Sequence, residues 1–234
     1  MKNIVKYLIF LLVIPAVILL GVFVFKDRQY AFIALIVAVL ACVPFFIFFE
    51  KNEQNGKLLV IIACMIALCS LSRFVFAALP HFKPVTALVI ITAMYFGPQA
   101  GFVTGAMTAV ISNFYFGQGP WTPFQMFAWG LIGLIAGLIA PIIKKRNAVS
   151  MVLLCLFGAF CGALYSLLLD TWTTIWWDGG FNLTRFITSI SIAAPVTLIY
   201  AASNVVFLAV FAYPMGRIFE RIKTKYGIER GNEI

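Results

Sequence analysis

The sequence predicts an all-α integral membrane protein, a bundle of about eight hydrophobic helices. Of its 234 residues, 63% are hydrophobic and only 11% are charged, whereas a soluble domain carries about 25% charged residues. Such a chain has too few polar side chains to cover a surface that faces water. Its apolar residues form long runs without the alternation of a membrane β-strand. Helices are therefore expected, because a helix satisfies its own backbone hydrogen bonds in lipid.

Eight apolar runs approach the length of about 20 residues that a spanning helix needs. The first follows Lys2 and Lys6 as in a signal peptide, but no cleavage site of small residues ends it, so a transmembrane helix is expected. The fourth is short and is followed by Gly97 and Pro98, which fits a short helix, a re-entrant segment or one end of a bent span. The last is long enough to tilt or to bend at Pro195. The runs are residues 4–25, 30–49, 58–79, 85–96, 100–116, 123–143, 149–169 and 187–215.

Basic residues divide unequally between the two sides that eight spans would create. Twelve of the 17 Lys and Arg residues fall on the side of both termini and four on the other side, while Arg73 lies within a span. Because cytoplasmic loops carry the excess of Lys and Arg, both termini are predicted to be cytoplasmic. This placement also accounts for the net charge of +9. No nucleic-acid partner is expected, because the basic residues are not interleaved with exposed aromatic side chains.

The residue types that catalysis and metal binding require are scarce. The chain has one histidine, His81, and no Gly-rich phosphate loop ending in Lys-Ser or Lys-Thr. No cluster of carboxylates or histidines has the spacing of a metal site, and the five cysteines all lie in apolar runs. We therefore expect neither an enzyme nor a resident metal or cofactor.

The predicted outward loops, residues 80–84, 117–123 and 170–185, are rich in aromatic residues. Four of the five tryptophans lie in them: Trp121, Trp172, Trp176 and Trp177. A belt of interfacial aromatic residues would populate both faces of the membrane, but no tryptophan lies at the cytoplasmic end of a span. This asymmetry favours a functional role for the outward face.

Polar side chains converge at the depth of these loops. Arg73 lies in the outer half of the third run, and a charged side chain at the centre of a membrane costs about 2.5–3.5 kcal/mol. Arg73 either extends toward the membrane surface or pairs with Asp170 at the outer end of the seventh run. Asn113, Gln118 and Gln125 lie at comparable depth. Mixed aromatic and amide groups are typical of a site for an organic solute rather than for a bare ion.

Small residues at intervals of four mark places where helices approach closely in lipid. Gly97, Gly101 and Gly105 form one such series, which is expected to pack inside the bundle. Ala63 and Ala67 lie near the cytoplasmic end of the third run. An Ala-x-x-x-Ala patch at that place is suited to contact with another membrane subunit.

Three stretches of the sequence resemble the S components, or substrate-binding subunits, of energy-coupling factor (ECF) vitamin transporters. They read KPVTA at 83–87, FGPQAGF at 96–102 and GQGPWTPFQM at 117–126, and the similarity extends from about residue 58 to the end. The resemblance implies the cytoplasmic membrane of a prokaryote. It also implies two additional helices in residues 1–57, a six-helix substrate-binding core in residues 58–216 and a basic cytoplasmic tail in residues 217–234.

The same resemblance implies partners and a ligand. Ala63 and Ala67 would dock on the transmembrane T component, and two ABC ATPases would hydrolyse ATP. The stretch at 117–126 is most similar to S components assigned to cobalamin or a related corrinoid, with a queuosine precursor, folate and riboflavin as alternatives. Two alternatives belong to other functional classes. One is a stand-alone secondary carrier, although the chain shows no internal repeat of the kind that such carriers usually have. The other is a membrane enzyme or scaffold. The candidate substrate-binding residues are Arg73, His81, Lys83, Asn113, Tyr115, Gln118, Trp121, Gln125, Trp129, Asp170, Trp172 and Trp176.

Overall fold

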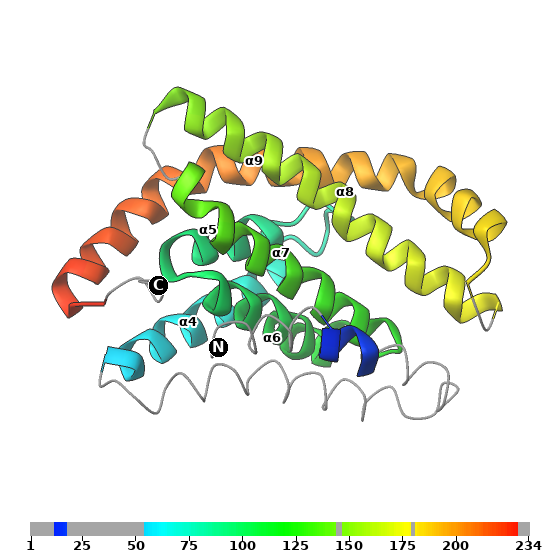
Figure 1. Cartoon of the computed structure of the whole chain (residues 1–234), viewed down its shortest axis with the longest axis horizontal. Coiled ribbons are helices and arrows are strands. Elements are labelled where there is room, and N and C mark those ends of the chain that lie inside the picture. Colours follow the sequence, from blue (N-terminus) through cyan, green and yellow to red (C-terminus); the bar gives the residue numbers. More distant parts are fainter. Residues whose placement is uncertain (1–11, 18–53, 144–146, 179–180, 229–234) are drawn as a thin grey trace.

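The structure, a computed structural model, describes residues 12–17, 54–143, 147–178 and 181–228, and these residues contain helices and no strand (Figure 1). Six labelled helices match in order the six predicted after residue 57, so the all-helical fold is confirmed. The first two predicted helices lie outside the described residues except at 12–17, and the total of eight stays a prediction. The helices are α4 (Gln54–Val75), α5 (Val85–Phe96), α6 (Pro98–Phe116), α7 (Trp121–Ile143), α8 (Ala148–Asp178) and α9 (Leu183–Tyr226).

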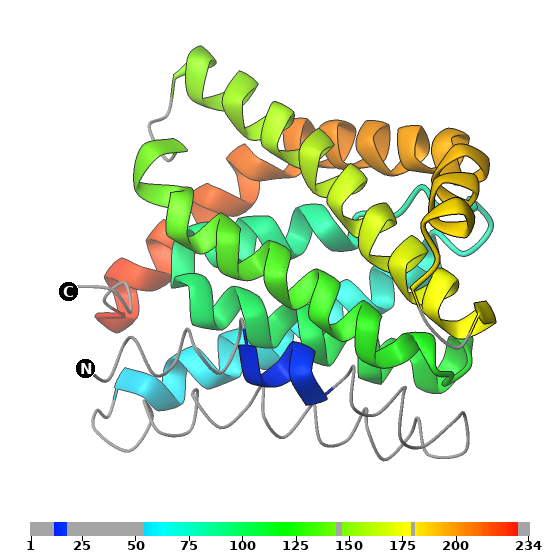
Figure 2. The same ribbon diagram turned by 45° about the vertical axis from the view of Figure 1, so that its right-hand side comes forward.

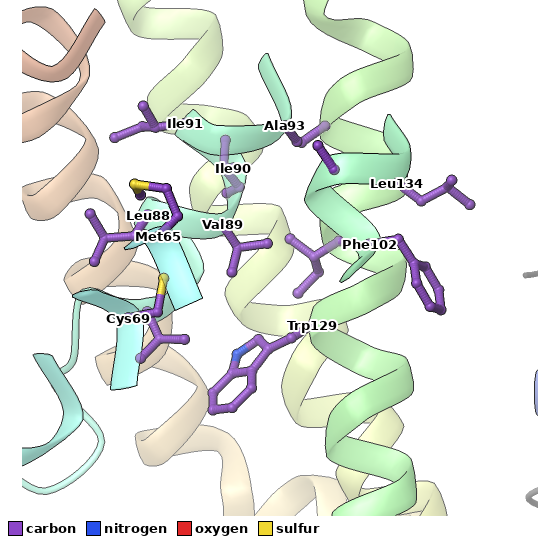
Figure 3. Close-up of a cluster of buried hydrophobic side chains, with 14 of the residues drawn as sticks. Met65, Cys69, Leu88, Val89, Ile90, Ile91, Ala93, Phe102, Trp129 and Leu134 are labelled. Carbon is purple, nitrogen blue, oxygen red and sulfur yellow. The ribbon is translucent and has the colours of Figure 1, made fainter. Parts of the chain in front are cut away.

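The short helix α5 lies at the centre of the described bundle. All 12 of its residues are buried, and it contacts each of the other five labelled helices. Figure 3 shows the side chains of Leu88, Val89, Ile90 and Ile91 pointing in different directions. A helix that is apolar on every side is typical of such a buried position. Among the three possibilities left open for the run 85–96, the structure therefore shows a short helix.

Glycines allow α6 and α7 to cross with their backbones in contact. A Cβ added to Gly133 would lie 2.3 Å from the carbonyl carbon of Gly101, and one added to Gly105 would lie 2.4 Å from the carbonyl oxygen of Trp129. Gly97, with φ 94°, separates α5 from α6, and Pro98 stands at the first position of α6, where its missing N–H costs no helical hydrogen bond. The predicted packing role of this series of small residues is confirmed.

Helix α8 extends well past the predicted span at 149–169. The prediction that residues 170–185 form an outward loop is wrong for most of that stretch, because α8 continues to Asp178 and α9 begins at Leu183. Thr171, Thr173 and Thr174 donate their hydroxyl hydrogens to backbone carbonyls four residues earlier. Their polar groups are thus satisfied within the helix, and no Gly or Pro lies between Asp170 and the end of α8.

Helix α9 is the longest element, with 44 residues. Pro195 and Pro214 lie inside it, and its ribbon bends along its length (Figure 1), as proline in a helix interior causes. The helix continues past residue 216, so the predicted basic tail begins inside it. Helices α8 and α9 cross on one side of the bundle and α4 lies on the other, with α5, α6 and α7 between (Figures 1 and 2).

Four of the described helices are long and apolar enough to cross a membrane, which supports a multi-pass membrane protein. They are Gly56–Val75, Trp121–Ile143, Ala148–Trp177 and Leu183–Tyr226.

Candidate functional site

A cavity of about 290 Å³ opens at the end of the bundle where α4 ends and α5 begins. Five helices and the loop between α4 and α5 contribute to it, and its walls combine charged, amide and aromatic side chains. The lining residues are Arg73, Pro80, His81, Lys83, Val85, Thr86, Gln125, Trp129, Tyr165, Tyr200 and Asn204.

Arg73 is held by neutral partners on α6. Its Nη1 donates to Asn113 Oδ1 at 2.8 Å and to the hydroxyl of Ser112. Only 8% of Arg73 is exposed. The ion pair with Asp170 that the sequence suggested is absent from the described interactions, because α6 presents its two acceptors directly to the guanidinium.

The amide of Asn113 extends this connection to α7 and α8. Asn113 is 1% exposed, and its Nδ2 donates to Gln125 Oε1 at 2.8 Å and to Thr122 Oγ1 at 3.1 Å. Gln125 Nε2 then donates to the Tyr165 hydroxyl at 2.8 Å. One chain of hydrogen bonds therefore runs from α4 through α6 and α7 to α8. A buried hydrogen-bond network of this kind stiffens the groups that it joins.

Aromatic rings form a second wall of the cavity. Trp129, drawn in Figure 3, stacks on Tyr165 with ring centroids 5.3 Å apart and an interplanar angle of 19°. Tyr200 meets Tyr165 edge-on at 5.2 Å. The indole N–H of Trp129 donates to Thr86 Oγ1 at 3.3 Å. The Arg73 guanidinium lies over the Trp129 ring, 5.2 Å from its centroid, a cation–π geometry.

The loop between α4 and α5 closes one side of the cavity. His81 has φ 61°, a left-handed conformation that is uncommon outside glycine, and its Nδ1 is 3.0 Å from the Tyr200 hydroxyl. The Ser203 hydroxyl donates to the Lys83 carbonyl at 3.0 Å and joins the loop to α9. Burial, and second the charge of Arg73, lower the pKa of the Lys83 ammonium below its usual value. The loop thus places one cation beside another at the cavity.

Five of the predicted site residues line the cavity together: Arg73, His81, Lys83, Gln125 and Trp129. Asn113 lies directly behind them and orients two of them through hydrogen bonds. Whether any of them binds a ligand stays a prediction.

The other six predicted residues lie outside the cavity lining. Tyr115 is 73% exposed. Gln118 Nε2 donates a hydrogen bond to the carbonyl oxygen of Val110 at 2.9 Å, and so pairs a backbone carbonyl in the C-terminal part of α6. Asp170 is half-buried on α8.

The remaining three are tryptophans that form a cluster of their own, with centroid distances of 6.1 Å from Trp121 to Trp172 and 5.8 Å from Trp172 to Trp176. The indole nitrogen of Trp172 is enclosed there without a hydrogen-bond partner.

Sequence reasoning missed four polar or aromatic lining residues, namely Thr86, Tyr165, Tyr200 and Asn204. Both tyrosines lie within long apolar runs, where a single phenol does not stand out as a binding residue.

The predicted partner residues Ala63 and Ala67 are both exposed on α4. Val60, Leu68 and Leu71 on the same helix are exposed as well. The described structure therefore leaves this apolar strip open to lipid or to another subunit.

Comparison with known proteins places this architecture in a family. The sequence profile described as "ECF-type riboflavin transporter, S component" matches residues 53–221. A UPF0397 protein of Aliivibrio salmonicida is 25% identical over 170 residues, with 68% of this chain and 87% of the relative aligned. A UPF0397 protein of Vibrio atlanticus is 24% identical over 170 residues, with 68% and 88% aligned. No solved structure matches at a comparable level of significance. The profile spans most of the chain and all of the six labelled helices except the last five residues of α9, and the chain therefore belongs to the family of ECF-type riboflavin transporter S components.

Proposed function

We propose that this chain is the substrate-capturing membrane subunit of an ECF-type importer, and that the cavity at Arg73 and Trp129 holds its ligand on the outer side of the membrane. The observation that carries the proposal is the cavity wall, where stacked aromatic rings adjoin an ordered network of amides. Family membership supplies the transport role. The positive-inside distribution of Lys and Arg supports an outward-facing cavity.

The ligand is a planar nitrogen heterocycle of moderate size. Small-molecule sites measure about 300–1,000 Å³, and the cavity, at about 290 Å³, stands at the lower limit of that range. Trp129, Tyr165 and Tyr200 offer ring faces and edges, and Gln125 offers an amide beside them. A flavin, named in the family description, is of this class. A corrinoid, the ligand expected from the sequence, is much larger, so the cavity volume supports a smaller compound.

The partners are a transmembrane T component and two ABC ATPases, which supply ATP hydrolysis. The exposed pair Ala63 and Ala67 supports docking on α4, because small residues permit close approach of a second helix in lipid.

Binding by the purified full chain in nanodiscs tests the proposal. Quenching of tryptophan fluorescence is measured with riboflavin, folate, queuine and cobalamin. Trp129→Phe is expected to weaken binding about two- to twelvefold, the equivalent of losing about 0.5–1.5 kcal/mol of aromatic contact. Trp121→Phe is the matched control, because Trp121 lies in the tryptophan cluster outside the cavity lining. Failure of all four compounds to bind at micromolar concentration, or equal weakening by both substitutions, would show that this cavity is not the site.

Transport is tested separately in liposomes. The chain alone is expected to bind without accumulating the ligand, and uptake is expected only with the T component, the two ATPases and ATP. Uptake by the chain alone, driven by an ion gradient, would contradict the proposal and favour a stand-alone carrier.

A further inference from the structure

We propose that the ligand is an anion, and that its carboxylate or phosphate group binds between Arg73 and Lys83 while its ring system occupies the aromatic part of the cavity. The inference rests on the proposed function, which makes this cavity the binding site, and adds the charge of the ligand.

Two cations face the same small cavity. Arg73 and Lys83 both line it, and both lie over the ring of Phe116, with Arg73 Cζ 4.7 Å and Lys83 Nζ 4.9 Å from its centroid. The two cationic centres are therefore no farther apart than the sum of these distances. Like charges held this close repel unless an anion lies between or beside them.

Asp170 acts electrostatically on Tyr200 at the cavity, but no described carboxylate forms an ion pair with Arg73 or Lys83. Neither Asp nor Glu is among the described residues that line the cavity, and the side-chain hydrogen bonds of Arg73 go to the neutral groups of Ser112 and Asn113. Buried arginines are otherwise usually paired with an acid, since removing an unpaired charge from water is costly. An unpaired pair of cations at a ligand cavity is the arrangement that an anionic ligand would complete.

Arg73 also keeps hydrogen-bond donors available for such a ligand. Only its Nη1 has described partners. Its Nε and Nη2 have no described hydrogen-bond partner, and the residue lines the cavity. The guanidinium is held in place by the rings of Phe116 and Trp129. A fixed planar fork with free donors matches the two oxygens of a carboxylate or phosphate.

The rest of the cavity selects for an aromatic body on the same ligand. Trp129, Tyr165 and Gln125 lie beside Arg73, so a single compound reaches both the rings and the cations. A neutral heterocycle such as riboflavin would fill the aromatic part and leave both cations unpaired.

Matched neutral and anionic compounds test this inference on the purified full chain in nanodiscs. Pterin is compared with pterin-6-carboxylate, and riboflavin with riboflavin 5′-phosphate, by isothermal titration calorimetry. In at least one pair the anion is expected to bind about tenfold or more tightly, as a charge-assisted contact predicts. Preference in the pterin pair alone identifies a carboxylate ligand, and preference in the flavin pair alone identifies a phosphate.

Variants then assign the preference to residues. Lys83→Gln, in the loop, is expected to lower the anion preference, which is the ratio of the dissociation constants of the neutral and the anionic compound, about tenfold. Arg185→Gln is the matched control, because Arg185 is an exposed cation at the start of α9 that does not line the cavity. Thermal unfolding of each variant verifies that it remains folded.

Three results would overturn the inference. The first is tighter or equal binding of the neutral member in both pairs, which leaves the proposed function intact. The second is a preference that Lys83→Gln and Arg185→Gln reduce equally. The third is absence of binding by all four compounds, which overturns the proposed function as well.

Discussion

The backbone contact between α6 and α7 allows a quantitative prediction about stability. A Cβ on Gly133 would lie 2.3 Å from the carbonyl carbon and oxygen of Gly101, whereas ordinary van der Waals contact begins at 3.4 Å. Backbone atoms cannot rotate away as a side chain does, so Gly133→Ala forces the two helices apart by about 1 Å. Overpacking costs about 1–3 kcal/mol. Because the two helices have to move apart along their whole crossing, we expect the free energy of unfolding to fall by an amount near the upper end of this range, about 3 kcal/mol.

Thermal unfolding of the purified protein in one detergent measures this loss. A destabilisation of about 3 kcal/mol lowers Tm by about 6–12 °C for a chain of this size. Gly56→Ala is the control, because a Cβ at this exposed position of α4 meets nothing within 4 Å. Alanine is the better helix former by about 1 kcal/mol, so this variant is expected to match or exceed the wild-type Tm. Equal Tm values for the two variants would refute the direct contact between α6 and α7.

Three further predictions concern the network, the partner surface and pH. Asn113→Leu removes an acceptor from the buried Arg73 guanidinium and is expected to cost about 3 kcal/mol; a change in unfolding free energy below about 0.5 kcal/mol would contradict the network. Replacing Ala63 and Ala67 together by Leu is expected to abolish co-purification with the T component while ligand binding persists, and unimpaired assembly would remove the pair from the interface. The lowered pKa of Lys83 means that the folded chain loses this proton at lower pH than the unfolded chain, so stability rises with pH below the usual lysine value of about 10.4. Lys83→Gln is expected to flatten the rise in Tm as the pH approaches this value from below, and an unchanged slope would show that Lys83 does not cause it.

Apolar run length predicted the helical elements well, because in lipid a backbone segment has few alternatives to a helix. The predicted run 123–143 and the observed α7, Trp121–Ile143, differ by two residues at one end. The end of α8 was predicted wrongly for a physical reason. Thr171 and its neighbours look polar enough for a loop, but their hydroxyls donate to backbone carbonyls of the same helix. The length of an apolar run gives no information about such hydrogen bonds.

Polar residues within apolar runs marked part of the site in advance. Arg73 and Gln125 stand out in the sequence because a polar group in a membrane helix is costly and therefore seldom without a role. Tyr165 and Tyr200 did not stand out, since tyrosine is common near membrane interfaces. Trp121 and Trp129 look equivalent in sequence, yet only Trp129 lines the cavity.

The sequence by itself determined that this chain is a helical membrane protein, where most of its helices lie, and which polar residues have to be accommodated inside it. Hydrophobicity and spacing along the chain carry that information. Only the tertiary structure decided the partners of those residues. Arg73 bonds to Asn113 rather than to Asp170 and lines the same cavity as Lys83, because the rotation and crossing of each helix about its neighbours set which side chains meet. Close packing at glycines such as Gly101 and Gly133 sets those crossings, and it depends on pairs of residues far apart in the sequence.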